Sequence, residues 1–273
     1  MATEYIQTRL GDIAYRLDGA GPPLLLLQRF RGTMDDWDPA FLSALAAERT
    51  VIRFDNLGVG ETPGEAPETV AGMAQVAIAF LESLDYGALD VLGWSLGGYI
   101  AQIVALEAPT RVRRLVIAGS GPGAVPEGPA AHPRVAEIAA KVSADPEDLL
   151  FLFFSSTPAG RAAGEAHLRR MAAADHPPVK AETGLRQRTA VLAWTAGQGD
   201  ARPRLADLHM PVLVANGVAD VMVPAFRSFV LAQEAPNAKL ILYPDAGHAF
   251  LFQYAERFTR DLLTFLSEPS TSP

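Results

Sequence analysis

A serine between glycines is the residue in this chain best suited to nucleophilic chemistry. Ser95 lies in the run Gly-Trp-Ser-Leu-Gly at 93–97, between an apolar stretch at 89–92 and a small-residue-rich stretch at 96–108. This context predicts a strand that turns sharply into a helix, where glycines at 93 and 97 avoid backbone clashes. Such a turn would lift the Ser95 hydroxyl towards the positive end of the helix dipole. We therefore predict Ser95 as a catalytic nucleophile.

A serine hydroxyl is a weak nucleophile at neutral pH and needs an adjacent base. His248 follows a predicted strand at 240–243, and Gly247 before it lets the chain turn towards Ser95. His209 is predicted to be structural. The other three histidines lie in the central part of the chain and are expected at the surface: His132, His167 and His176. His248 is therefore the predicted base.

A carboxylate must hold the tautomer of this base and stabilise its protonated form. Asp220 follows a predicted strand at 212–215, in the run Gly-Val-Ala-Asp-Val-Met-Val-Pro. Asp245 is the alternative, but it lies only three residues before His248, so we expect a turn-forming or supporting role for it. The predicted catalytic set is Ser95, Asp220 and His248.

Strand-like and helix-like stretches alternate along most of the chain, which predicts a mostly parallel sheet covered on both faces. Residues 4–18 are expected to form a hairpin. The other predicted strands are 24–27, 51–54, 89–92, 112–118, 212–215 and 240–243. The predicted helices in this part are 35–48, 68–84, 96–108, 225–233 and 254–266.

The alternation stops between 120 and about 207, where several helix-like stretches occur without a convincing strand. We interpret this block as an insertion between two core strands. The predicted organisation is a core domain in two parts, 1–120 and 208–268, a helical cap at 121–207, and a flexible tail at 269–273.

These motifs together resemble the α/β-hydrolase superfamily over nearly the full length. The resemblance rests on Gly-Trp-Ser-Leu-Gly-Gly at 93–98, Gly-Val-Ala-Asp-x-x-x-Pro at 217–224 and Ala-Gly-His at 246–248. The chain looks like the small serine esterase, lactonase and perhydrolase branch. This implies an α/β fold with an eight-stranded, mostly parallel sheet and a helical cap after strand 6.

The resemblance also implies an oxyanion hole made of two backbone N–H groups. The first would be that of Leu96, directly after the nucleophile. In the family, the second belongs to the residue after a His-Gly pair. Gln28 and Arg29 replace that pair here, which makes Phe30 the candidate second donor. Losing one such donor costs about 3–4 kcal/mol of transition-state stabilisation.

Arg29 places a cation where the family has glycine. It could hold a substrate carboxylate while Gln28 shapes the oxyanion hole. We favour a structural role instead, with Arg29 paired to one acidic neighbour. The candidates are Asp35, Asp36 and Asp38.

Apolar residues near the predicted site indicate a pocket for a small or medium hydrophobic acyl or alcohol group. A dense apolar run at 149–154 lies in the predicted cap. Taken singly, most such residues would be core residues. The predicted substrate contacts are Gln28, Arg29, Trp94, Phe154, Trp194, Met222 and Phe250.

These features predict a serine hydrolase that cleaves a carboxylic ester or lactone through an acyl-enzyme, without cofactor or metal. Three alternatives stay open on the same scaffold. They are a perhydrolase or haloperoxidase-like enzyme, a carbon–carbon bond hydrolase or cofactor-free oxygenase, and a slow-turnover ligand receptor. A serine nucleophile argues against haloalkane dehalogenase and epoxide hydrolase, which resemble this fold but use aspartate.

Composition narrows the setting of this activity. The 273 residues include no cysteine, which excludes disulfides, a thiolate nucleophile and cysteine-ligated metals. A net charge of −8 argues against nucleic-acid binding. Neither a signal peptide nor a membrane-spanning stretch is recognisable, so we expect a cytoplasmic protein without membrane contact. A homodimer, and the identity of the acyl and alcohol groups, are left open.

Overall fold

One eight-stranded sheet organises the protein, whose computed structural model describes residues 2–172 and 179–269. The strands are β1 (Glu4–Thr8), β2 (Gly11–Asp18), β3 (Pro23–Leu27), β4 (Thr50–Phe54), β5 (Leu89–Trp94), β6 (Val112–Ala118), β7 (Val212–Gly217) and β8 (Ala238–Tyr243). Their order is β1-β2-β4-β3-β5-β6-β7-β8, and β4 to β8 run parallel with β3. The antiparallel β1–β2 pair confirms the predicted hairpin.

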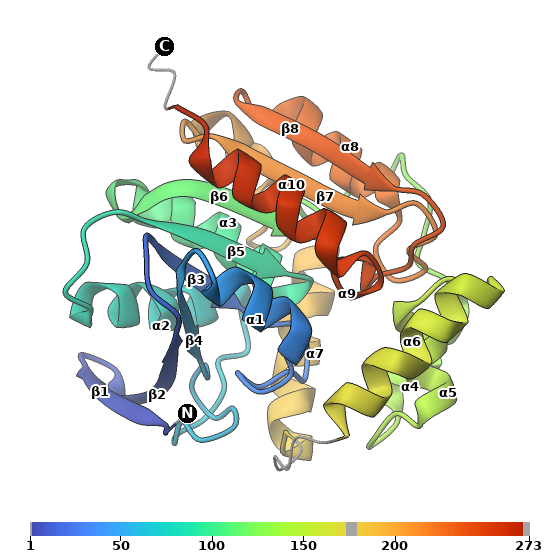
Figure 1. The fold of residues 1–273 in the computed structure, drawn as a ribbon, viewed down its shortest axis with the longest axis horizontal. Coiled ribbons are helices and arrows are strands. Elements are labelled where there is room, and N and C mark those ends of the chain that lie inside the picture. Colours follow the sequence, from blue (N-terminus) through green and yellow to red (C-terminus); the bar gives the residue numbers. More distant parts are fainter. Residues whose placement is uncertain (1, 173–178, 270–273) are drawn as a thin grey trace.

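Helices cover both faces of this sheet. In Figure 1, α1 (Pro39–Ala46) and α10 (Ala255–Ser267) lie in front of it, and α2 (Val70–Ser83), α3 (Leu96–Glu107) and α8 (Ala225–Glu234) lie behind it. Strand β3 shows why the centre of the sheet is apolar. Leu25 and Leu27 pack into the core on one face, while Leu24 and Leu26 pack into the core on the other. A strand buried on both faces requires such a continuous apolar run.

The predicted helix at 35–48 is shorter in the structure, because α1 begins only at Pro39. The Asp38 side chain accepts a hydrogen bond from the Ala40 N–H and caps the helix. Proline at the first helical position is compatible with this start, since that N–H has no helical partner. The residues before Asp38 therefore belong to the loop after β3.

Between β6 and β7 the described residues form helices and no strand. The helices are α4 (Pro133–Ala140), α5 (Pro146–Phe153), α6 (Pro158–Met171), α7 (Ala181–Thr195) and the short η2 (Arg202–Asp207). Figure 1 shows α4, α5 and α6 grouped together, with α7 apart from them. This segment therefore reaches the sheet domain at two places. The limits of a cap at 121 and 207 stay a prediction, and His176 lies outside the described residues.

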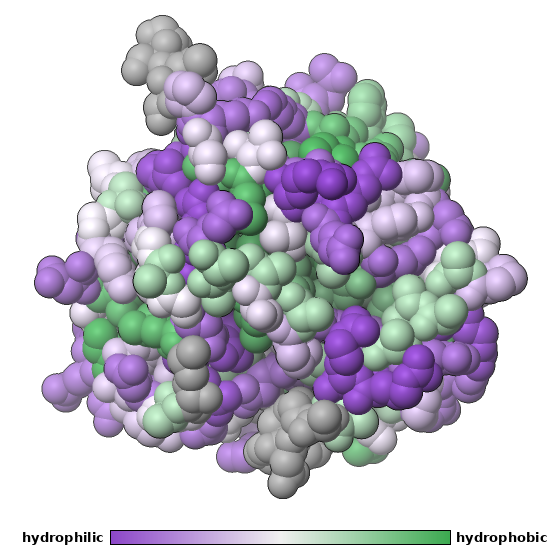
Figure 2. Space-filling view, viewed as in Figure 1, coloured by the Kyte–Doolittle hydropathy of each residue, from purple (hydrophilic) through white to green (hydrophobic). Residues whose placement is uncertain are grey.

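The surface in Figure 2 carries hydrophilic residues over much of the face shown, with smaller hydrophobic patches between them. The apolar faces of the helices are turned towards the sheet, where they form two cores. None of the described helices has both the length and the apolar character needed to cross a membrane.

Candidate active site

Ser95 occupies a strained turn between β5 and α3. Its backbone has φ 57° and ψ −118°, a region that residues other than glycine rarely adopt. A Cβ on Gly93 would lie 2.1 Å from the Gly97 carbonyl oxygen, and one on Gly97 would lie 2.0 Å from that of Leu27. Both glycines are thus required by close backbone approach. The Ser95 side chain makes no capping hydrogen bond to α3, so its hydroxyl is not engaged by the helix.

His248 and Asp220 form a buried pair. Nδ1 of His248 lies 2.7 Å from Oδ2 of Asp220. The other oxygen of Asp220 accepts backbone N–H groups from Met222 at 2.8 Å and Val223 at 2.9 Å, which orients the carboxylate. Nε2 of His248 is buried and has no hydrogen-bond partner in the described part of the chain. This nitrogen is therefore available to accept a proton.

The three predicted catalytic residues follow β5, β7 and β8, so parallel strands bring them to the same edge of the sheet. Ser95 and His248 line one cavity. Asp245, the alternative acid, instead accepts a hydrogen bond from the Thr157 hydroxyl at 2.8 Å. The structure therefore pairs His248 with Asp220.

The loop after β3 leaves one backbone N–H available beside the cavity. Among residues 29–33, every N–H except that of Phe30 has a hydrogen-bond acceptor in the described residues. The pairs are Arg29 N to Gln28 Oε1 (2.8 Å), Arg31 N to Gln187 Oε1 (2.8 Å), Gly32 N to Arg29 O (3.0 Å) and Thr33 N to Asp36 Oδ2 (2.8 Å). Phe30 lines the cavity with Ser95. Leu96 begins α3, where backbone N–H groups lack helical partners.

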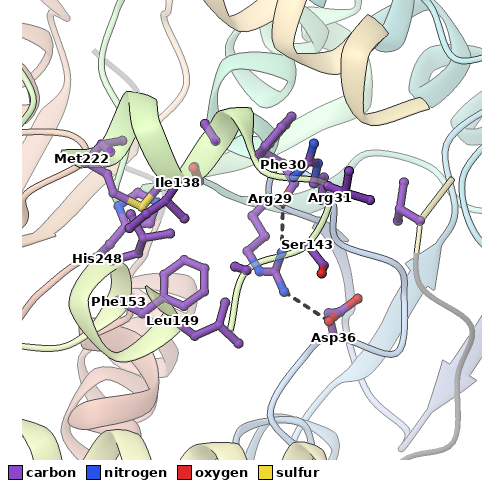
Figure 3. Close-up of a pocket in the computed structure, with 17 residues that line it drawn as sticks. Arg29, Phe30, Arg31, Asp36, Ile138, Ser143, Leu149, Phe153, Met222 and His248 are labelled. Carbon is purple, nitrogen blue, oxygen red and sulfur yellow. Dashed lines mark hydrogen bonds and ion pairs between the residues drawn. The ribbon is translucent and has the colours of Figure 1, made fainter. Parts of the chain in front are cut away.

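The cavity has a volume of about 330 Å³ and a mainly apolar lining (Figure 3). Helix α5 contributes Leu149, Leu152 and Phe153, and α4 contributes Val135 and Ile138. These residues recur at helical spacing, so one face of each helix is turned to the cavity. In the described part of the chain, no group of three or more His, Asp or Glu side chains is placed to hold a metal ion.

Two of the predicted substrate contacts, Arg29 and Met222, line this cavity, but the other five do not. Trp94 packs beneath the site and donates from Nε1 to the His248 carbonyl at 3.1 Å. Trp194 stacks on Tyr99, with ring centroids 5.0 Å apart. Phe250 stacks on Tyr243 at 5.1 Å. These three aromatic residues are thus buried core residues.

Phe154 and Gln28 are the remaining two. Phe154 follows the last residue of α5 and packs near His167, away from the cavity face, where Phe153 lies instead. Phe154 has an extended backbone (φ −122°, ψ 156°), so its side chain does not continue the helix face that carries Phe153, and a run of apolar letters does not reveal where the helix ends. The Gln28 amide is engaged within its own loop, where Nε2 donates to the Thr33 carbonyl at 3.2 Å.

Arg29 makes the pairing with an acidic neighbour that the sequence favours. Its Nη2 lies 3.0 Å from Asp36 Oδ1, which is the expected pairing with an acidic neighbour. Nη1 donates to the Phe30 carbonyl at 2.9 Å. The guanidinium also lies 5.3 Å from the centroid of the Phe153 ring, within the cavity. Arg29 therefore braces the loop and also lines the cavity, and a contact with substrate stays a prediction.

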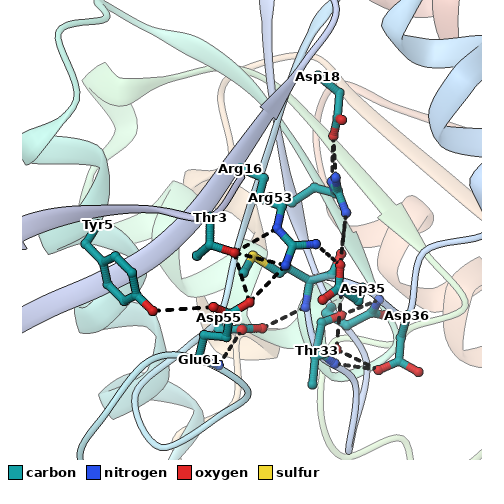
Figure 4. Close-up of polar contacts among 12 residues, drawn as sticks. Thr3, Tyr5, Arg16, Asp18, Thr33, Asp35, Asp36, Arg53, Asp55 and Glu61 are labelled. Atoms are coloured by element: carbon teal, nitrogen blue, oxygen red, sulfur yellow. Dashed lines mark hydrogen bonds and ion pairs between the residues drawn. The ribbon is translucent and has the colours of Figure 1, made fainter. Parts of the chain in front are cut away.

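A buried carboxylate ties this loop to the loop after β4 (Figure 4). Oδ1 of Asp55 accepts from the Met34 N–H at 2.7 Å, and Oδ2 accepts from the Glu61 N–H at 2.9 Å. Burial raises the pKa of Asp55 to about 6, although the two N–H donors act in the opposite direction. A Cβ on Gly60 would lie 2.1 Å from Oδ2, so glycine is required there.

The expectation that His167 lies at the surface is wrong, because this residue on α6 is buried. Its Nδ1 lies 2.8 Å from Oδ2 of Asp38, and its ring stacks on Phe252 with a centroid distance of 4.8 Å. Arg170, one helical turn later, binds the same carboxylate at 2.6 Å. Nothing local to His167 signals this burial, since its partner is 129 residues away.

Comparison with known proteins agrees with this fold. A model of the alpha/beta hydrolase family matches residues 20–261. An alpha/beta hydrolase fold protein from Chitinophaga pinensis is 33% identical, with a TM-score of 0.88 and 98% of each chain covered. The poly(3-hydroxyalkanoate) depolymerase of Ectopseudomonas oleovorans is 30% identical, covering 90% of this chain and 84% of that protein. The pimeloyl-(acyl-carrier protein) methyl ester esterase of Nitrosomonas europaea is 29% identical, covering 91% and 97% respectively.

Proposed function

The chain belongs to the alpha/beta hydrolase family, and we propose that it is a serine hydrolase that cleaves a small or medium hydrophobic carboxylic ester or lactone through an acyl-enzyme. The observation that carries this proposal concerns His248, whose Nε2 has no hydrogen-bond partner among the described residues. Its Nδ1 contacts Asp220, and the residue lines the same cavity as Ser95. A base that is oriented by a carboxylate and free on its other side is what a serine nucleophile needs.

The reaction begins when the Ser95 hydroxyl attacks the substrate carbonyl and gives its proton to Nε2 of His248. Asp220 stabilises the resulting imidazolium. The Leu96 and Phe30 N–H groups donate to the oxygen that becomes negative in the tetrahedral intermediate. His248 then protonates the leaving alcohol, and the same residue activates the water that releases the acid.

The cavity supports the proposed substrate class. A volume of about 330 Å³ with an apolar lining suits a small or medium acyl group rather than a long polar chain. Two of the relatives, a methyl ester esterase and a polyester depolymerase, carry names that refer to carboxylic esters. We extend that chemistry, and not their particular substrates, to this chain.

The test is a panel of p-nitrophenyl esters and lactones with the wild type and Ser95→Ala, combined with intact-mass detection of an acyl adduct. Ser95→Ala should lose at least about 10³-fold in kcat and form no adduct. Ser83→Ala, a serine substitution on α2 remote from the site, is the matched control. An adduct or undiminished turnover in Ser95→Ala would contradict the proposal, and faster turnover with peroxide than with water would indicate a perhydrolase.

A further inference from the structure

Arg31 holds an uncommon backbone conformation directly beside the predicted oxyanion donor. Its φ is 53°, in the left-handed region that side chains other than glycine rarely adopt. Such a conformation costs on the order of 1–3 kcal/mol and persists only where the surroundings hold it. The contacts around Arg31 therefore identify what holds the loop.

Helix α7 supplies the principal contact. The Arg31 N–H donates to Oε1 of Gln187 at 2.8 Å, across 156 residues of sequence. Gln187 is only 4% exposed, so water competes little for this bond. One helical turn earlier, a Cβ on Gly184 would lie 2.6 Å from Nε of Arg31, which shows how closely the arginine side chain follows α7.

This hydrogen bond bears directly on Phe30. The Phe30 carbonyl and the Arg31 N–H belong to one planar peptide unit. The carbonyl accepts from Arg29 Nη1 at 2.9 Å, while the N–H donates to Gln187, so this unit is held at both ends. Its orientation constrains the Phe30 backbone and thereby the direction of the Phe30 N–H, which has no acceptor in the part of the chain that the structure describes.

Close packing does not fix the loop on the side that faces Gln187. A small cavity of about 30 Å³ lies behind the loop and is lined by Gln28, Leu96 and Gln187. That volume is enough for one water molecule, so the loop has room to shift on this side. On this side of the loop, its movement is then limited by the hydrogen bond that Gln187 Oε1 accepts from the Arg31 N–H.

We propose that Gln187 is a positioning residue for the oxyanion hole: through the Arg31 N–H it aims the Phe30 N–H at the reacting oxygen. The inference rests on the proposed function, since it concerns the same reaction. It means that the segment between β6 and β7 contributes to the chemistry through α7, as well as lining the cavity through α4 and α5.

The experiment compares Gln187→Met, which removes the acceptor at similar volume, with Gln187→Glu, which keeps an acceptor oxygen. Thr183→Val is the matched control, because the Thr183 hydroxyl also joins α7 to the sheet domain, by donating to the Gly58 carbonyl at 2.7 Å. Each variant is assayed for kcat and KM on the best ester, for binding of an alkylboronic acid that forms a tetrahedral adduct, and for thermal unfolding.

Gln187→Met should lower kcat by about 10- to 100-fold and weaken boronate binding in parallel, with little change in KM, because a misdirected donor is felt in the transition state. Gln187→Glu should recover most of the loss. Thr183→Val should lower the unfolding temperature without this kinetic pattern.

Equal kinetic effects in Gln187→Met and Thr183→Val would overturn the inference alone and assign Gln187 a structural role. The same holds if Gln187→Met retains wild-type kcat and boronate affinity. Absence of Ser95-dependent turnover in the wild type would instead overturn the proposed function, and the inference with it.

Discussion

Two histidines in this molecule contact buried carboxylates at nearly the same distance. His248 lies 2.7 Å from Asp220 at the edge of the sheet, and His167 lies 2.8 Å from Asp38 between α6 and α1. Judged by this contact alone, the two pairs are equivalent. Their surroundings are not.

Within residues 2–172 and 179–269, Asp220 accepts hydrogen bonds from two backbone N–H groups besides its contact with His248, and Nε2 of His248 has no hydrogen-bond partner. Asp38 also binds Arg170, and the His167 ring is stacked on Phe252. Burial alone would raise the pKa of Asp38, but the hydrogen bonds from His167 and Arg170 outweigh it and hold the pKa below its ordinary value.

The difference teaches that an acid–histidine pair becomes a candidate catalytic base only when its second nitrogen meets a nucleophile and a cavity. The Asp38 pair instead fastens α6 to the start of α1, since the same carboxylate also caps that helix. In the proposed reaction the Asp220–His248 pair passes a proton, whereas the Asp38–His167 pair holds two elements together.

The strongest test of this contrast replaces each carboxylate by its amide. Asp220→Asn should lower kcat by about 10⁴-fold, because the amide no longer holds the productive tautomer of His248. Asp38→Asn should leave the kcat of the folded protein within about tenfold of the wild type. Steady-state assays on one ester suffice, and comparable losses in both variants would contradict the division of roles.

The second test concerns stability. At pH 7, Asp38→Asn should lower the free energy of unfolding by about 3 kcal/mol, because it leaves the buried His167 and the half-buried Arg170 without their carboxylate. The pKa of Asp38 is lower in the folded protein than its ordinary value of 3.8. The stability that this carboxylate contributes is therefore fully present above pH 3.8, and it is lost progressively as the pH falls below that value. Urea denaturation should therefore show a smaller difference in the free energy of unfolding between the wild type and Asp38→Asn below pH 4 than at pH 7.

Glu147→Gln is the control for this experiment, because it breaks an exposed ion pair with Arg161 in the same group of helices. Exposed pairs contribute little, so its transition should shift far less. A gap between Asp38→Asn and the wild type that stays constant with pH would show that the carboxylate charge is not responsible.

A third carboxylate sharpens the comparison, because Asp55 is held by backbone N–H groups rather than by a histidine or arginine. Folding raises the pKa of Asp55 from 3.8 to about 6. Its contribution to stability is therefore fully present below pH 3.8 and is lost as the pH rises through about 6. This pKa shift corresponds to a change in the free energy of unfolding on the order of 3 kcal/mol. Between pH 4 and 7 the wild type should lose more stability than Asp55→Asn, and parallel urea-denaturation profiles would refute this.

The fold could be predicted well because its signals are local. Continuous apolar runs such as 24–27 indicate strands buried on both faces, and the structure places them in a mostly parallel sheet. The predicted helix at 35–48 is longer than α1, because Asp38 caps the helix and the first helical residue is Pro39. Apolar spacing does not show where a cap forms.

The candidate site also has features that the sequence predicts and features that it does not. The turn at Ser95 could be predicted because Gly93 is demanded by steric contact with Gly97, four residues later. The contact that demands Gly97 is with the Leu27 carbonyl on a separate strand, and only the structure shows it. The apolar run at 149–154 indicated a pocket, but its letters could not tell that Phe153, and not Phe154, faces the cavity. That choice depends on how α5 rotates against the sheet domain.

By itself, the sequence determined the strand–turn–helix at Ser95, the alternation that builds the sheet, and the order of Ser95, Asp220 and His248 along the chain. Only the tertiary structure decided that Gln187 meets Arg31 and that His167 meets Asp38. The physical reason is the distance along the sequence between the residues that interact. Backbone sterics and periodicity act between neighbours in sequence, whereas these hydrogen bonds join residues that folding alone brings together.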